Sequence, residues 1–214
     1  VPGLVEALAD DESVVRVEAA KALRLISDVD SLPMLLDALR DSDGRVRRAV
    51  LDAVIAFKAS ALDGLVDLLR DPNIPVRMAA LEAIAQIGDA RVADSLLTFV
   101  RDKSPEIRAA VAAALGKMRR GEYTSTLLPL LGDKTALPGK TMRVCDVAAS
   151  ALLMLETPEA QAAVQAWRVR EGKAPPATKN GSAADAVRRL PGRKEARSEE
   201  RTPLPQTELA EHLD

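Results

Sequence analysis

The sequence predicts an all-α fold: an α-solenoid of about five stacked helical hairpins, followed by a disordered C-terminal tail. Three observations favour it: a repeat near 31 residues long, apolar residues at helical spacing within each repeat, and polar turns between two helices. Five aspartates, spaced 31, 30, 31 and 31 residues apart, set the period: Asp10, Asp41, Asp71, Asp102 and Asp133. Six residues after each of the first four stands an arginine: Arg16, Arg47, Arg77 and Arg108. A fixed period of this length is typical of one small unit copied in tandem.

The first helix of each repeat, called the A helix, is predicted just before the aspartate. Leucine stands six residues before it in all five copies: Leu4, Leu35, Leu65, Leu96 and Leu127. Leucine or valine stands two residues before it: Leu8, Leu39, Leu69, Val100 and Leu131. A spacing of four places both residues on one face of a helix.

A short turn and a second helix, the B helix, come next. Asp43, Asn73 and Ser104 stand where an N-cap is needed, and Pro75 and Pro105 fall in the first helical turn, where a missing N–H is harmless. Apolar residues recur one residue before each arginine, and seven and ten residues after it: Val15, Val46, Val76, Ile107, Leu23, Val54, Ile84, Leu115, Ile26, Phe57, Ile87 and Met118. They form one stripe at a period of 3.6 residues, so each hairpin buries its apolar faces only by stacking on its neighbours.

The repeated aspartates and arginines, here called the ladder residues, are predicted to be structural. An aspartate in the turn can accept N–H groups at the start of the B helix, where the helix dipole also favours a negative charge. An arginine one turn into that helix can bridge to the turn or the aspartate of the adjacent repeat. Such charge-assisted contacts stabilise a fold by roughly 1.5–3 kcal/mol each.

Composition excludes several classes of protein. Hydrophobic residues make up 47% of the 214 residues and aromatic residues only 2%, so the core must be aliphatic. A formal net charge of −2 gives no strong attraction to nucleic acid or anionic membranes. Cys145 is the single cysteine, which excludes an internal disulfide framework. The sequence has neither an apolar run of about 18 residues nor a signal peptide, so no membrane association and a cytoplasmic location are expected. The first residue is Val1 rather than Met, which is compatible with a fragment or a processed chain.

The segment Val15-Arg16-Val17-Glu18-Ala19-Ala20-Lys21-Ala22-Leu23 resembles the HEAT repeat. The short period resembles that of bacterial HEAT-like proteins of the phycobilisome-lyase type, and the resemblance covers residues 1 to about 170. It implies a binding scaffold, with lyase activity on bilin chromophores in some members. Another branch carries out iron-dependent hydroxylation of deoxyhypusine with several His-Glu pairs as ligands. This sequence has a single histidine, His212, which cannot supply several such pairs, so that activity is excluded.

The fifth repeat departs from the pattern. Cys145 stands at the ladder arginine position, and the connection through Lys134–Lys140 is about six residues longer than in the other repeats. An end effect, in which a small thiol packs in the core, is favoured over a reactive thiol beside a lid-like loop. Thr157 and Pro158 then begin one more helix, predicted to cap the stack with Trp167 as its anchor; the alternative is that Trp167 docks a partner.

Two segments are predicted: a repeat array over residues 1–171 and a disordered polar tail over residues 172–214. From Glu171 onward the chain carries eight basic and eight acidic residues between Pro and Gly punctuation. The tail is interpreted as a solvated linker, and its arginine cluster is a candidate weak site for an acidic partner or nucleic acid.

The predicted function is a non-enzymatic scaffold that binds another protein along the concave face of the solenoid. The B helices are expected to line that face with the residues one and five positions after each ladder arginine: Val17, Lys21, Arg48, Asp52, Met78, Glu82, Ala109 and Ala113, followed by Asp146 and Ser150. No catalytic residues, metal ligands or cofactor site can be recognised in the sequence. The alternative is an accessory subunit of an enzyme, such as a phycobilisome-lyase-type protein. Nucleic-acid binding is less favoured because no basic groove with aromatic contacts is predicted.

Overall fold

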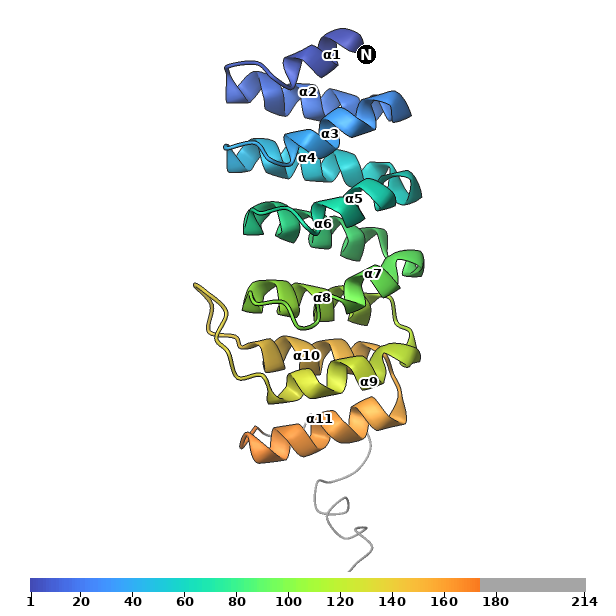
Figure 1. The fold of residues 1–214 in the computed structure, drawn as a ribbon, viewed down its shortest axis with the longest axis vertical. Coiled ribbons are helices and arrows are strands. Elements are labelled where there is room, and N and C mark those ends of the chain that lie inside the picture. The colour runs from blue at the N-terminus through green and yellow to red at the C-terminus, as the bar shows by residue number, and fades with distance from the viewer. Residues whose placement is uncertain (174–214) are drawn as a thin grey trace, which may run out of the picture. The chain divides into compact units, whose positions relative to one another are not determined.

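The structure, a computed structural model, describes residues 1–173 and confirms the predicted all-α solenoid. Eleven α-helices stack one hairpin on the next along the long axis (Figure 1), and no β-strand occurs within these residues. Most of the predicted disordered tail, residues 174–214, lies outside the described residues. Gly172 and Lys173, which were assigned to the tail, continue from the array, and Lys173 lies 4.4 Å above the ring of Trp167.

The A helices are short, and one is found in every repeat: α1 (Pro2–Ala7), α3 (Leu32–Ala38), α5 (Leu62–Leu68), α7 (Ala93–Leu97) and α9 (Thr124–Leu127). From the second repeat on, 3-10 turns flank or extend them: η1 (Val29–Ser31), η2 (Lys58–Ala61), η3 (Ala90–Val92), η4 (Gly121–Tyr123) and η5 (Leu128–Gly132). The leucine six residues before each ladder aspartate is fully buried in the second to fifth repeats.

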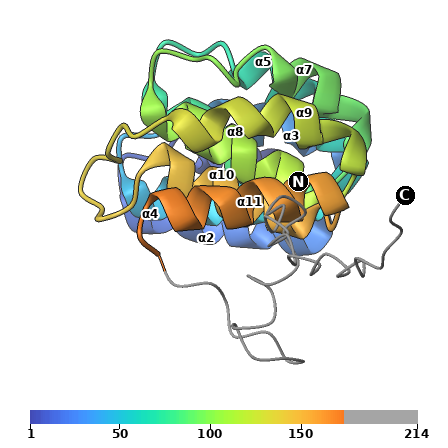
Figure 2. The same cartoon turned by 90° about the horizontal axis from the view of Figure 1, so that it is seen from below.

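The B helices are longer and carry the apolar stripe: α2 (Ser13–Ile26), α4 (Gly44–Ala56), α6 (Ile74–Ile87), α8 (Pro105–Lys117) and α10 (Val144–Met154). Seen along the stack, the A helices α5, α7 and α9 lie on one side and the B helices α2, α4 and α10 on the other (Figure 2). One aliphatic core runs between the two layers through all the repeats. None of the helices within residues 1–173 combines the length and apolar character needed to cross a membrane.

Each turn between an A and a B helix has the same hydrogen-bond pattern. Oδ1 of every ladder aspartate accepts the backbone N–H two residues later, at distances of 2.7–3.1 Å. This Asx turn holds the chain at the entrance to the next helix. Asp43 and Ser104 then cap their helices as predicted, because their side chains accept the N–H groups of Arg45 and Ile107. Asn73 stands at the N-cap position of α6, as predicted, but its side chain accepts no capping N–H.

The C-terminal end of the array is closed by α11 (Pro158–Arg170). Thr157 caps this helix through the N–H of Ala160, with Pro158 at its first position, as the sequence predicts. The helix packs on α10 and η5, and Trp167 is only 4% exposed. Trp167 therefore anchors a capping helix, whereas its side chain is too buried for a partner to dock on it.

Candidate protein-binding groove

An open groove crosses the B-helix face of the middle three repeats. Its walls come from α4, α6 and α8, which lie next to one another in the stack. The groove is lined by Gly44, Arg47, Arg48, Leu51, Pro75, Met78, Ala79, Leu81, Glu82, Ala85, Ala110, Ala113 and Lys117. Met78, Ala79, Ala110 and Ala113 are only partly covered, so they give the groove an apolar floor.

Charged side chains border this floor. Arg48 Nη1 donates to Glu82 Oε1 at 2.9 Å and so joins α4 to α6, while Arg48 Nε lies 3.4 Å from Asp52 Oδ1. Both partners of the Arg48–Glu82 pair are about half exposed. Lys117 is exposed at the α8 end and forms no ion pair within residues 1–173. The rim therefore offers an ion pair on one side and a cation without a carboxylate partner on the other.

Four of the eight predicted binding residues line this groove: Arg48, Met78, Glu82 and Ala113. Asp52 lies beside them through its contact with Arg48. Val17 and Lys21 lie on α2, outside the groove, and Lys21 pairs with Glu18 of its own helix at 2.7 Å.

Ala109 was predicted to face the groove, but it is buried, with 5% exposure. It lies two helical turns before Gly116, on the face of α8 that packs against α10. Because Gly116 has no side chain, α10 approaches this face closely and covers it. Ala110, the next residue along α8, lines the groove in its place.

Asp146 and Ser150 also lie away from the groove, at the C-terminal end of the stack. Asp146 accepts a hydrogen bond from the backbone N–H of Arg143 at 2.8 Å and forms an ion pair with Lys173. Arg143 Nη2 lies 2.9 Å from Glu171 Oε2, which links the start of α10 to the end of α11. Hydrogen bonds from Lys173 and Arg143 outweigh the effect of burial and lower the pKa of Asp146 to about 2. The contacts of Arg143 with Glu171 and of Asp146 with Lys173 fasten the capping helix.

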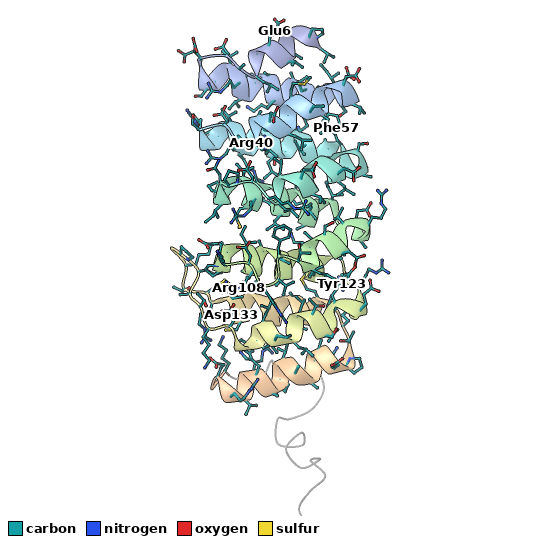
Figure 3. The ribbon with its side chains drawn as sticks, in the orientation of Figure 1. Glu6, Arg40, Phe57, Arg108, Tyr123 and Asp133 are labelled. Carbon is teal, nitrogen blue, oxygen red and sulfur yellow. The ribbon has the colours of Figure 1, made fainter. Side chains whose placement is uncertain are left out.

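The ladder arginines make two kinds of contact. First, Nη1 of each donates to the carbonyl oxygen of its own ladder aspartate at 2.7–2.9 Å, and so ties the turn to the B helix. Second, some of them reach the carboxylate of the next repeat. Arg16 Nε donates to Asp41 Oδ2, and Arg108 Nε to Asp133 Oδ2, both at 2.7 Å (Figure 3 shows Arg108 beside Asp133).

The bridge between repeats is not uniform. Arg77 Nη2 lies 3.9 Å from Asp102 Oδ1, which is a weak ion pair. Arg47 reaches no ladder aspartate of the next repeat in the described part of the chain. Asp71 instead accepts from Arg40 Nε at 2.8 Å, and Arg40 lies in the turn that follows the preceding A helix, α3. The sequence pattern singled out Arg47 for this contact and missed Arg40.

The ladder carboxylates make stability sensitive to acid. Burial favours the neutral form of Asp41 and Asp133, but hydrogen bonds from Arg16 and Arg108 outweigh it and lower both pKa values. For Asp71, the N–H of Asn73 is the main cause of a lowered pKa, reinforced by Arg40 against the opposing effect of burial.

Since these folded-state pKa values lie below the unfolded value of about 3.9, the groups contribute stability that is fully present above about pH 4. That contribution is lost as pH falls through the folded values. Urea unfolding should therefore show a midpoint that is steady from about pH 7 to 5 and that drops below about pH 4. In Asp133→Asn the drop should be shallower than in the unaltered chain. A midpoint that falls equally steeply with pH in both proteins would contradict the role given to this carboxylate.

Cys145 packs in the core of the fifth repeat. Its side chain is fully buried, and burial, with the nearby charge of Asp146, raises the pKa of the thiol. A raised pKa works against a reactive thiolate. Its backbone N–H donates to the Asp133 carbonyl at 2.9 Å, and so takes the acceptor that a ladder arginine binds in other repeats. The longer connection forms a small hairpin, in which Ala136 pairs with Arg143.

A family model described as HEAT repeats matches residues 1–73 and 62–138. The chain belongs to the HEAT repeat family. No curated protein sequence matches this HEAT repeat protein. No group of three or more potential metal ligands is found within its described residues.

Solved structures with a similar backbone include the complex of CpcE and CpcF of phycocyanin lyase from Nostoc sp. PCC7120. That match has 21% identity and a TM-score of 0.54, and covers 74% of this HEAT repeat chain and 66% of the other. A designed armadillo repeat protein in complex with the peptide (KR)4 matches at 18% identity and a TM-score of 0.49, covering 79% and 88%. Human deoxyhypusine hydroxylase in complex with glycerol matches at 20% identity and a TM-score of 0.34, covering 78% and 80%. At these identities the matches concern the fold alone.

Proposed function

We propose that this protein is a non-enzymatic scaffold that holds a segment of a partner protein in the groove between α4, α6 and α8. The observation that carries this proposal is the apolar floor of that groove, where Met78, Ala79 and Ala113 remain partly uncovered. Burying such a floor under an apolar side chain is favourable by about 25 cal/mol for each Å² removed from water.

The rim favours a partner segment with mixed polarity. Lys117 offers a cation to a carboxylate of the partner, whereas Arg48 and Glu82 satisfy each other and leave that side close to neutral. An amphipathic helix or extended peptide with apolar anchors and an acidic residue near one end fits these features. The lining residues include no aromatic side chain on which bases could stack, so a nucleic-acid strand fits less well.

The test compares a variant of the groove with a charge reversal outside it. A partner is first captured with the full chain, identified by mass spectrometry and purified, and its Kd is then measured by calorimetry. Lys117→Glu combined with Met78→Glu should weaken binding by about tenfold or more, because one change reverses the rim charge and the other places a carboxylate on the floor. The matched control is Lys103→Glu, which reverses an exposed charge outside the groove and should leave the Kd within about twofold.

Helical content and melting must remain the same in all variants for the comparison to count. An unchanged Kd in the groove variant, or an equal loss in the Lys103→Glu control, would rule out the groove as the binding surface.

A role as an accessory subunit of an enzyme is the second candidate. The likeness to the CpcE and CpcF complex of phycocyanin lyase supports it at the level of the fold. A titration with a free bilin chromophore should then shift the visible absorbance of the chromophore, and an unchanged spectrum would count against this candidate.

A further inference from the structure

A second groove lies on the A-helix side of the stack, opposite the groove between α4, α6 and α8. This A-side groove runs between the fourth and fifth repeats and has a volume of about 900 Å³, against about 410 Å³ for the first groove. The fourth repeat forms one wall and the fifth repeat the other. The wall residues used below are Leu97, Thr98 and Arg101 on one side, and Ser125, Thr126 and Pro129 on the other.

Shorter A helices and one residue change account for this groove. Between the second and third repeats, α3 and α5 have seven residues each and pack on one another, and a Cβ added to Gly64 would overlap the side chain of Leu36. The equivalent helices α7 and α9 have only five and four residues, and Leu97 and Thr126 stand at the equivalent positions. Threonine has the Cβ that glycine lacks, so Leu97 cannot seat as Leu36 does. Leu97 and Thr126 remain partly uncovered and line the groove.

The walls offer apolar and hydroxyl groups that suit a peptide. Leu97 is half-buried and Pro129 is exposed, so each leaves apolar surface in the groove. Thr98 and Ser125 are exposed on opposite walls, where their hydroxyls can bond the N–H and C=O groups of a peptide backbone. The lining includes no aromatic side chain on which a base could stack, so a nucleic-acid strand fits less well.

The two carboxylates of the groove are already engaged. Asp133 binds Arg108 at 2.7 Å (Figure 3), and Asp102 lies 3.9 Å from Arg77. Arg101 is exposed and forms no ion pair with any residue in the range 1–173. The charge that the groove leaves without a partner is therefore positive.

The turns from A to B helices also change from acidic to basic along the stack. In the first repeat the turn reads Asp10-Asp11-Glu12, with three acidic residues in succession. In the fourth repeat the ladder aspartate is flanked by Arg101 and Lys103, both exposed. An acidic segment is thus attracted to the end of the stack that holds the A-side groove and repelled by the other end.

We propose that the A-side groove binds an acidic peptide segment of a second partner protein. A carboxylate of the segment pairs with Arg101, and an apolar side chain lies against Leu97 and Pro129. Because the two grooves lie on opposite sides of the stack, the protein can hold two partners at once.

The test selects random peptides of about twelve residues, displayed on phage, against the full chain. Selection takes place in about 0.15 M salt, where exposed charges more than about 8 Å apart are largely screened. Selected peptides that fail to bind Arg101→Glu are synthesised, and their Kd is measured by calorimetry. These peptides should be rich in Asp and Glu and should bind the Arg101→Glu variant about tenfold or more weakly than the unaltered chain. Replacing their acidic residues with Asn and Gln should weaken binding to a similar extent.

Two further variants test the position of the peptide. Ser125→Glu places a like charge on the opposite wall and should weaken binding by about fivefold or more. The matched control is Arg70→Glu, which reverses an exposed arginine at the same turn position of the third repeat and should leave the Kd within about twofold.

The combined Lys117→Glu and Met78→Glu variant of the first groove should leave the Kd for these peptides unchanged, so the two binding proposals stand or fall separately. Circular dichroism checks that all variants keep their helical content. The A-side groove is overturned as an acidic-peptide site if no Arg101-dependent peptide is acidic, if Ser125→Glu has no effect, or if Arg70→Glu costs as much as Arg101→Glu.

Discussion

Replacing Gly116 with valine is expected to lower the free energy of unfolding by about 3 kcal/mol. A Cβ at this position would lie 2.7 Å from Cα, 2.8 Å from Cβ and 3.0 Å from the carbonyl oxygen of Ala151. These are two backbone atoms of α10 and the methyl carbon of Ala151, so no rotamer change can make room. The helices α8 and α10 would have to separate, which would open the joint between the fourth and fifth repeats.

The matched control is Gly3→Val in α1, where an added Cβ meets no atom within 4 Å. Valine favours the helix slightly more than glycine does, so this change should leave the free energy of unfolding within about 0.5 kcal/mol. Urea unfolding of both variants, followed by circular dichroism at 222 nm, measures the difference. Equal costs at Gly116 and Gly3 would contradict the close approach of α8 and α10.

The sequence predicts the A and B helices, the turns and the buried stripe because those features depend on local spacing. It does not single out Gly116, since a glycine inside a helical pattern carries no local sign of what packs on it. The consequence is visible in the groove. Treating every repeat as identical places Ala109 on the exposed face, whereas Ala109 is buried on the side of α8 that packs against α10, and Ala110 lines the groove.

The same assumption fails for the bridges between repeats. Arg16 and Arg108 reach the next carboxylate, but Asp71 binds Arg40, which lies in the turn after α3 and for which the repeat pattern predicts no such contact. Long side chains from different helices can reach one acceptor, and the sequence alone does not decide which one arrives. The repeat period therefore predicts which carboxylates are bridged better than it predicts their partners.

The energetic consequence is a difference between two arginines that the sequence treats as equivalent. Arg108→Gln is expected to lower the free energy of unfolding by about 3 kcal/mol, and Arg47→Gln by about 1 kcal/mol. Both arginines donate Nη1 to the carbonyl of their own ladder aspartate at 2.8 Å, so both variants lose that tie. Only Arg108 also binds the next carboxylate, Asp133, and its loss leaves a part-buried charge without that partner.

A double-mutant cycle separates this bridge from the shared contact. Combining Arg108→Gln with Asp133→Asn should give a coupling energy of about 1–2 kcal/mol. Either single variant already removes the bridge, so the second substitution costs less stability when the first is present. The equivalent cycle of Arg47→Gln with Asp71→Asn should give a coupling below about 0.5 kcal/mol, since Asp71 binds Arg40 instead. Similar couplings in the two cycles would mean that the bridges follow the sequence repeat after all. A difference in the expected direction would mean that repeats with the same residues at the same positions are held together by different side chains.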